Sequence, residues 1–272
     1  MLPSVAVGTC QKAQDRVWTI DDKLFALAIF KRSARAYRFI RQYMLLPSET
    51  TLKSLLQKVP IEPGISPVFL SLLKDKVQKM CPSDKVCMVS FDDIFLSGNL
   101  FFNKSLKLVE GFEHYGQRGR TNRVADHALV FMAQGLHSKW ILPVAYFFVS
   151  KTCPAAVLKT LIKDVINSLF SVGLNVVGTL SDQGSNNRGA ISELRQETGD
   201  NIFYSVGNCR LVHIWDMPHI IKNVRNNLLT SDVEFKPGKV AKWRHLIEYF
   251  KLDEALYKLS PLTYRHLAGP YA

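Results

Sequence analysis

The stretch that most constrains the fold is 174–195, where an apolar run gives way to a polar loop and then to a helix-compatible segment. Residues 174–177 have the character of a buried strand, and 190–195 suit a helix. Asp182 therefore falls at a strand end, where α/β sheets place binding and catalytic groups. On this stretch alone, a turn or helix-capping aspartate is an equally good interpretation, so a second carboxylate on a neighbouring strand is needed.

The loop after Asp182 has its own local chemistry. Gly184 favours a sharp turn, and Ser185 or Asn186 is placed to cap the following helix. Asn187 adds a polar group beside the carboxylate. These residues are typical of a strand-to-helix connection that carries a functional side chain.

A second carboxylate comes from 86–96, a nearly continuous apolar strand with Asp92 and Asp93 in its middle. A buried carboxylate must be hydrogen-bonded, ion-paired or bound to a metal, so acids in a central strand are hard to explain structurally. Adjacent strand residues point to opposite faces, so only one of these two acids can face a given site.

The order of the predicted elements indicates the architecture: a meander of three strands, then helix and strand in alternation. The strands are expected at 86–96, 128–133, 141–148, 174–177 and 211–215, the helices at 154–170 and 190–195, a hairpin at 98–109 and a Gly/Arg-rich loop at 111–122. This order predicts an α/β fold with an RNase H-like mixed sheet and flanking helices. In that layout the first strand lies beside the strand after the first helix, so Asp92 and Asp182 are expected to meet.

The first 80 residues differ from the rest in pattern and charge. Residues 1–17 show no periodicity and are interpreted as a linker, whereas 18–80 predict three or four short amphipathic helices joined by tight turns. Residues 1–80 hold 13 Lys and Arg residues against 6 Asp and Glu residues. This asymmetry favours a helix-turn-helix-like DNA-binding unit, although a solvated helix face explains the basic stripe equally well. The candidate DNA contacts are Arg35, Arg38, Arg41 and Lys53.

Composition narrows the class of protein and partner. A net charge of +12 and a pI near 9.5 favour a polyanionic partner. No apolar run reaches the roughly 18 to 20 residues of a membrane span. Five scattered cysteines exclude a disulfide framework or a paired-cysteine zinc site, and Cys87 is expected to be a small core residue. We therefore expect a soluble, intracellular chain with reduced thiols and no membrane partner, acting in the nucleus.

Two carboxylates from adjacent strands would form an oxygen-only site, which suits Mg²⁺ or Mn²⁺ better than zinc. Two such ions can activate water or a 3′-hydroxyl and stabilise the leaving oxygen at a phosphodiester. Such a site normally includes a third acid. Beyond residue 215 the sequence offers Glu234, Glu248, Asp253 and Glu254 as candidates for it, with no evident closing helix to carry one of them into the site.

Four blocks of the sequence resemble the P element transposase family, which includes the THAP-domain transposase-like proteins. The blocks are 91–93 (Phe-Asp-Asp), 125–131 (Ala-Asp-His-Ala-Leu-Val-Phe), 181–187 (Ser-Asp-Gln-Gly-Ser-Asn-Asn) and 216–228 (Asp-Met-Pro-His-Ile-Ile-Lys-Asn-Val-Arg-Asn-Asn-Leu). The resemblance covers roughly 18–266 and implies a DNA-cutting RNase H-like domain with a D-D-E set, interrupted by a helical GTP-binding insertion. It therefore implies an RNase H-like domain at 81–215 and the truncated start of the insertion at 216–272.

The resemblance also implies roles for individual residues. Asp92 and Asp182 would be the first two catalytic acids and the metal ligands, while the family usually has Glu where Asp93 stands. Asp216 and Lys222 would contact the nucleotide, Lys222 through its charge on a phosphate. His213 and His219 are interpreted as hydrogen-bonded structural residues, because a spacing of six across Pro218 does not put them on one face.

Two departures from the family pattern shape the functional hypothesis. No THAP zinc finger precedes residue 18, and the chain ends inside the insertion before a third acid, so we expect a fragment or a decayed, domesticated copy. The leading hypothesis is a transposase or domesticated derivative that uses Mg²⁺ or Mn²⁺ for DNA strand cleavage and transfer, incomplete in this chain. In a full-length form it would also bind GTP and form a homo-oligomer. The alternatives are a non-catalytic DNA-binding derivative and, less favoured without a P-loop, a GTP-binding switch.

Overall fold

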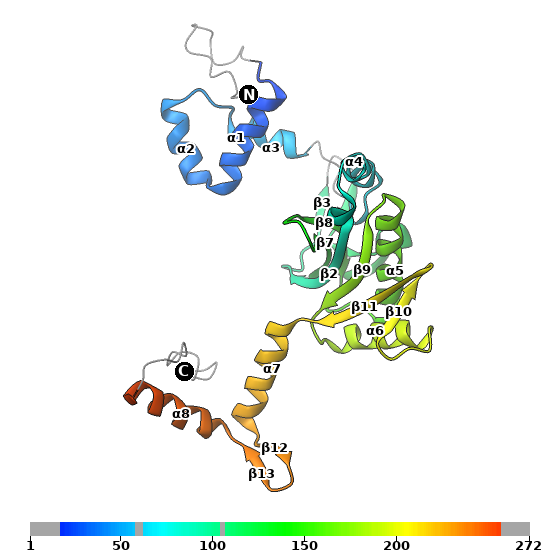
Figure 1. The fold of residues 1–272 in the computed structure, drawn as a ribbon. Helices are drawn as coiled ribbons and strands as arrows, with labels where there is room; N and C mark the ends of the chain where they lie inside the picture. The colour runs from blue at the N-terminus through cyan, green and yellow to red at the C-terminus, as the bar shows by residue number, and fades with distance from the viewer. Residues whose placement is uncertain (1–16, 58–61, 104–106, 257–272) are drawn as a thin grey trace. The chain divides into compact units, whose positions relative to one another are not determined.

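The computed structural model describes residues 17–57, 62–103 and 107–256, and it divides the chain into two compact units, 1–61 and 62–272. We call these the helical unit and the sheet unit and describe each by itself (Figure 1). The predicted linker at 1–17 lies outside the described residues except for Val17.

The helical unit contains α1 (Ile20–Arg32), α2 (Ala34–Tyr43) and α3 (Glu49–Gln57). Local polar groups fix the helix starts: Thr19 and Asp22 form a reciprocal capping box at α1, and Ser33 accepts from Ala36 N at α2. Its core is small and consists of Ala26, Tyr37 and Leu52, all fully buried. The Tyr37 hydroxyl donates to the Pro47 carbonyl at 2.6 Å, which ties α2 to the turn before α3. The three short helices that the sequence predicted here are confirmed.

The sheet unit is organised around a nine-stranded mixed sheet whose strands run in the order β10-β11-β9-β2-β7-β8-β5-β6, with β1 added beside β8. The strands are β1 (Gly64–Ile65), β2 (Val86–Phe95), β5 (Phe112–His114), β6 (Arg120–Val124), β7 (His127–Gly135), β8 (Ile141–Val149), β9 (Asn175–Ser181), β10 (Phe203–Val206) and β11 (Cys209–Trp215).

The RNase H-like arrangement is confirmed in its central pairings. The strands β2, β7 and β8 form an antiparallel meander, β9 pairs parallel with β2, and β11 pairs parallel with β9. Each parallel strand returns through a helix, α5 (Ala155–Ser171) before β9 and α6 (Ser185–Gln196) after it. The first strand and the strand after the first helix therefore lie side by side, as the element order predicts.

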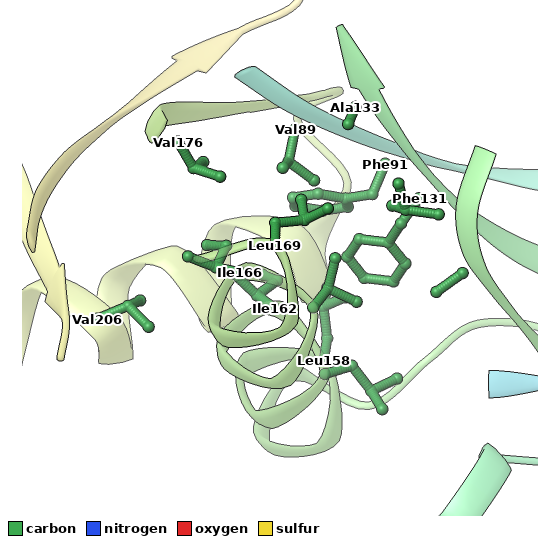
Figure 2. Packing of buried hydrophobic residues seen from close by; sticks show 14 of the residues in the cluster. Val89, Phe91, Phe131, Ala133, Leu158, Ile162, Ile166, Leu169, Val176 and Val206 are labelled. Atoms are coloured by element: carbon green, nitrogen blue, oxygen red, sulfur yellow. The ribbon is translucent and has the colours of Figure 1, made fainter. Parts of the chain in front are cut away.

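The main core lies between the sheet and one layer of helices (Figure 2). The inward face of α5 carries Leu158, Ile162, Ile166 and Leu169, which pack on alternate residues of the strands, including Val89, Phe91, Phe131 and Val176. The helix ends in a Schellman motif, in which Gly173 adopts φ +91° and the amides of Gly173 and Leu174 bond back to Phe170 and Leu169. The glycine signal in the sequence therefore marked the end of α5 correctly.

Residues 111–122, which the sequence predicts to be a loop, instead contribute β5, a short 3₁₀ turn at Gly116–Arg118 (η2) and the start of β6 to the edge of the sheet. The reason is Glu113, which is fully buried. Its carboxylate accepts bonds from Tyr115 and Thr121 hydroxyls at 2.8 Å and pairs with Arg123 at 2.9 Å. Burial pushes the Glu113 pKa up, but these partners outweigh it and hold the pKa below its ordinary value.

Helix α4 (Pro67–Gln78) belongs with the sheet and not with the N-terminal helices, with which the sequence analysis grouped it as part of 18–80. Leu73 and Val77 enter the main core, and Val77 lies against Gly173 at the end of α5. Amphipathic periodicity revealed that α4 has an apolar face but could not reveal which partner covers it.

The described residues also form a short 3₁₀ helix at Pro82–Lys85 (η1), two small hairpins and two further α-helices. The predicted hairpin at 98–109 is confirmed as β3 (Phe101–Asn103) paired with β4 (Leu108–Glu110). After β11 come α7 (Met217–Thr230), the hairpin β12 (Val233–Lys236) and β13 (Lys239–Ala241), and α8 (Trp243–Leu256). The last part of the predicted insertion, 257–272, lies outside the described residues. Among the helices described, none is long and apolar enough to cross a membrane.

Candidate active site

A pocket of about 370 Å³ lies over the ends of the central parallel strands. It is lined by Ser90, Phe91, Asp92, Ile94, Val130, Met132, Leu180, Ser181, Asp182, Asp216 and His219. On β2 and β9 the neighbouring residues Val89 and Thr179 are buried under the helix layer, while Ser90 and Leu180 alternate to the other side. The pocket therefore opens on the sheet face that α5 and α6 do not cover.

A shift in the register of β2 and β9 brings the two predicted acids to the same height along the neighbouring strands. Cys87 pairs with Val176, but the next residue, Met88, pairs with Gly178, so β9 has one extra residue. From there the pairs run evenly to Ser90 and Leu180, and two residues further along each chain stand Asp92 and Asp182. A one-residue difference in register would place them on opposite faces.

The bulge on β9 also explains a glycine. A side chain at Gly178 would put its Cβ 2.5 Å from the Val212 carbonyl oxygen on β11. Only glycine allows β11 to approach β9 this closely at the point where the register changes. The close approach positions the third parallel strand beside Asp182.

Asp182 is held by the loop that follows it. Its Oδ1 atom accepts from Gly184 N at 3.0 Å and from Asn187 Nδ2 at 2.6 Å. Both bonds go to Oδ1, so among the described residues Oδ2 is left for a ligand. Asn187, noted in the sequence only as a neighbouring polar group, therefore orients the carboxylate.

The expected capping of α6 was wrong. Gly184 itself is the N-cap residue, with φ −52° and no side-chain cap bond, whereas Ser185 and Asn186 belong to the helix. The glycine is not needed for a left-handed turn. A Cβ there would stand 3.2 Å from Asp182 Oδ1, so its absence leaves room for the carboxylate.

The two acids of β2 behave differently. Asp92 is exposed in the pocket, and its Oδ1 accepts from the Asp93 amide at 2.8 Å. Asp93 also has accessible surface, yet the surrounding protein raises its pKa through burial. The charge of His127 opposes that rise, while Asp92 and Asp182 add to it. The charge of Asp182 therefore acts on Asp93 of the neighbouring strand.

A third carboxylate lies in the same pocket, which the sequence did not predict. Trp215 on β11 pairs with Ser181, and the next amide, Asp216 N, donates to the Ser181 carbonyl at 2.8 Å. Asp216 is therefore level with Asp182 at the ends of neighbouring parallel strands. The signal that could have found it is the same one used for Asp182, an acid directly after an apolar strand.

The two residues suggested as nucleotide contacts lie on either side of the start of α7. Asp216 is the N-cap residue, and its Oδ2 lies 2.5 Å from His219 Nδ1. Lys222, two residues past Ile220 on the same helix, is exposed. Asp216 therefore stands at the N-terminus of α7 and lines the pocket of the two predicted metal ligands, whereas Lys222 is the sixth residue of that helix.

The two histidines have separate environments, as their spacing predicts. His213, a residue of β11, is buried and forms a hydrogen bond through Nδ1 with the Thr179 hydroxyl at 2.8 Å. Burial lowers the pKa of His213 to about 3, with the charge of Arg195 acting in the same direction. His219 is instead partly exposed and paired with Asp216. His213 is confirmed as a structural residue.

Three of the four candidate DNA contacts in the helical unit surround one carboxylate. Arg38 pairs with Glu49 at 2.7 Å, and this bond is the main cause that lowers the Glu49 pKa, with further contributions from the charges of Lys53 and Arg41. These three cations therefore share a surface of α2 and α3, and Arg35 is exposed one turn earlier on α2. Arg38 is partly neutralised, so Arg41 and Lys53 are the freer cations.

Within the described ranges, there is no group of three or more His, Cys, Asp or Glu side chains placed to hold a metal ion by themselves. The pocket thus offers carboxylates at strand ends but not a closed cage. Such an open arrangement suits an ion that also takes ligands from water and substrate.

Comparison with known proteins identifies a matching domain family and relatives of this chain. The model of the TNP-like RNase H N-terminal domain matches residues 61–195. The chain is 23% identical over 248 residues to DNA transposase THAP9 of Homo sapiens, and 26% identical over 233 residues to the Transposable element P transposase of Drosophila melanogaster. These alignments cover 87% and 84% of this chain but only 27% and 28% of the relatives, so the chain spans about a quarter of their length.

Among solved structures, the Drosophila P element transposase strand transfer complex matches the fold with a TM-score of 0.73. The match covers 93% of this chain and 54% of that one, at 23% identity. At this identity the likeness concerns the fold, and it agrees with the RNase H-like sheet described above. The domain match and the two relatives agree with the sequence blocks in making this chain similar to the P element transposase family.

Proposed function

We propose that this chain contributes an RNase H-like site for metal-dependent DNA strand cleavage and transfer, within a DNA transposase or a domesticated derivative. The observation that supports this most is the level position of Asp92 and Asp182 beyond paired positions of adjacent parallel strands, with both lining one pocket. Packing of the core does not require two acids on an open sheet face, so a bound ligand explains them better.

The donor set fits Mg²⁺ or Mn²⁺. RNase H-like transposases in general depend on divalent metal ions. Asp92 and Asp182 offer carboxylate oxygens, and magnesium in phosphoryl-transfer sites is commonly held by one or two carboxylates together with waters and substrate phosphates. Such ions, when bound, lower the pKa of the attacking water or hydroxyl and stabilise the leaving oxygen at a phosphodiester.

The protein's own contribution is to present the two carboxylates in fixed positions. Asn187 and the Gly184 amide hold Oδ1 of Asp182, so its Oδ2 has a defined direction. Asp92 is fixed by the ladder of β2 and by the Asp93 amide. Ile94 and the half-buried Met132 form an apolar wall beside them, which limits water around a bound phosphate.

Other parts of the proposal concern the protein to which this chain belongs. DNA would also be held by the surface of α2 and α3 that carries Arg35, Arg38, Arg41 and Lys53. The protein would act in the nucleus and would form a homo-oligomer. Asp216 and Lys222 would contact GTP in a longer form. The position of Asp216 in the acid pocket supports a link between the two functions, because one residue borders both.

Strand cutting tests the proposal. In a longer form of the protein that continues past residue 272, we expect Mn²⁺-dependent nicking of DNA to fall by at least about 10²-fold with Asp92→Asn or Asp182→Asn. Asp75→Asn is the matched control, since it removes the same charge from an exposed position on α4. Normal nicking by the Asp182→Asn variant would show that the assigned site is wrong.

A non-catalytic DNA-binding derivative is the second candidate. It is favoured by one observation: among the described residues no three or more His, Cys, Asp or Glu side chains are grouped so that they could hold a metal ion, although Asp216 and His219 line the same pocket. For the 272-residue chain we expect DNA binding without cutting, with an affinity that falls steeply as salt increases. If the longer form also binds DNA and never cuts it, the second candidate is the correct one.

A further inference from the structure

An exposed run of aromatic side chains continues from the acid pocket. We call Phe95, Phe101 and Phe102 the aromatic ridge; they are 74%, 57% and 58% exposed. The preceding residue of β2, Ile94, is 55% exposed and lines the pocket with Asp92. The ridge is therefore continuous in the chain with the candidate site.

The ridge is anchored to the sheet but not covered by it. The Leu96 amide donates to the Asp126 carbonyl at 2.7 Å, and the Ala125 amide donates to the Gly111 carbonyl at 2.9 Å. Gly111 in turn lies against Asn99, so the base of the β3–β4 hairpin is held beside the start of β7. The anchoring gives the exposed rings a defined place on the surface.

The hairpin itself cannot bury its aromatic residues. Phe101 and Phe102 are adjacent in a strand, so their rings lie on opposite faces of a two-stranded ribbon and each face presents one exposed ring to a partner. Such an isolated ribbon is at best marginally stable in water. Large exposed rings on a ribbon of this kind are typical of a surface that stacks against a partner.

The charge around the aromatic ridge indicates which kind of partner the ridge binds. The described residues between 94 and 125 include four Lys and Arg residues and two Glu residues, but Arg118 pairs with Asp164 and Arg123 with the buried Glu113. Lys107 in the hairpin and Arg120 on β6 are exposed. Exposed aromatic rings among cations match a nucleic acid whose bases are accessible, since cations contact the phosphates and rings stack on the bases.

Duplex DNA fits this surface less well, because its bases are already stacked inside the helix. We propose that the aromatic ridge binds unpaired bases of the DNA strand next to the acid pocket, so that the site acts on DNA that is locally opened. This inference rests on the proposed function and adds the form of DNA that the site takes. It requires no metal ion, so the two can be tested separately.

The test compares two DNAs of the same sequence, a closed duplex and a duplex with several unpaired nucleotides at one end, in EDTA. For the combined Phe101→Ala and Phe102→Ala variant, we expect affinity for the unpaired end to fall by about 10-fold or more, and affinity for the closed duplex by less than about 2-fold. Replacing the same residues with tyrosine should restore binding. Phe235→Ala is the matched control, because Phe235 is 61% exposed and also lies in a two-stranded hairpin.

Three results would overturn the inference: equal losses on both DNAs, the same loss with Phe235→Ala, or a change in oligomeric state that accompanies the loss and identifies the ridge as a contact between chains. The preference for unpaired DNA should persist in Asp92→Asn, Asp182→Asn protein. If that doubly substituted chain keeps the preference while the wild-type longer form never cuts, the proposed function fails and the ridge inference stands.

Discussion

The sheet unit and the helical unit are stabilised in different ways. The sheet unit has one continuous core that joins α4, α5 and α6 to the central strands, whereas the helical unit, among the residues described, buries only Ala26, Tyr37, Pro47 and Leu52. A large core can tolerate carboxylates and an open pocket at its edge. A small core leaves its unit dependent on helix caps and single hydrogen bonds. The comparison indicates that the candidate site lies on the unit with the larger core and that the basic helices form a separate unit with a smaller one.

The largest expected effect is on the core of the sheet unit. Phe131 is fully buried and packs against Phe91 in a tilted arrangement and against Phe147 edge to face, with ring centroids 5.4 and 5.8 Å away. Phe131→Ala should lower the free energy of unfolding of this unit by about 3–5 kcal/mol. Hydrogen exchange measured on peptides from each unit checks this. Faster exchange within 20–57 as well would show that the two units unfold together.

The corresponding change in the helical unit is Leu52→Ala. Leu52 is fully buried in the smaller core, so we expect a loss of about 2–5 kcal/mol confined to that unit. Because the unit has little stability to lose, its helices should melt at room temperature while the sheet unit stays folded. Exchange in peptides 20–57 and 128–180 measures both. A folded helical unit in this variant would contradict the contrast between the two cores.

Acid should lower the stability of the sheet unit more than that of the helical unit, because all seven histidines lie beyond residue 61. His213 has a folded pKa of about 3, below its ordinary value of 6.5. The unfolded chain therefore binds the proton more readily, and the contribution of His213 to stability is present above pH 6.5 and is lost as the pH falls from 6.5 towards 3. Urea unfolding at pH 7, 5.5 and 4.5 should show this loss for the sheet unit, with a slope of at most about 1.4 kcal/mol per pH unit.

The matched variant for the acid experiment is His213→Gln, which retains a partner for Thr179 but does not titrate. It should show a shallower decline in stability below pH 6.5 than the wild type. An unchanged pH dependence would mean that His213 is not the group responsible.

The smallest effects concern helix caps. Thr19→Ala removes the capping box of α1, and Ser66→Ala removes the bond from Phe69 N at the start of α4. Each should cost about 1 kcal/mol. The comparison predicts unequal consequences: a measurable rise in helix opening for α1, and almost none for α4, which the main core holds. Equal opening in the two helices would weaken that distinction.

The fold could be predicted where long patterns determined it. The order of apolar strands and the amphipathic 154–170 segment sufficed for the adjacency of β2 and β9. The edge strands β5 and β6 could not be predicted, because they are short and carry Glu113, a charge that normally indicates solvent. Its burial depends on partners such as Thr121 and Ser150, whose positions the sequence pattern does not reveal.

The candidate site was predicted in its residues but not in its geometry. Asp182 was identified from a strand end and Asp92 from its place inside an apolar strand, yet their level position depends on the extra residue in β9, which no hydrophobic pattern reveals. Asp216 was interpreted only through the family resemblance. Its place beside Asp182 follows from the pairing of β11 with β9, a tertiary feature.

The central claim is that Asp92 and Asp182 hold the same divalent ion. A Mn²⁺ titration followed by electron paramagnetic resonance tests it on the wild type, each single Asn variant, the double variant and the Asp75→Asn control. We predict that either single substitution weakens binding by about 10-fold or more and that the double variant is hardly worse than the singles, because one shared ion is already lost. Independent losses that multiply in the double variant, or binding unchanged by either substitution, would contradict the account.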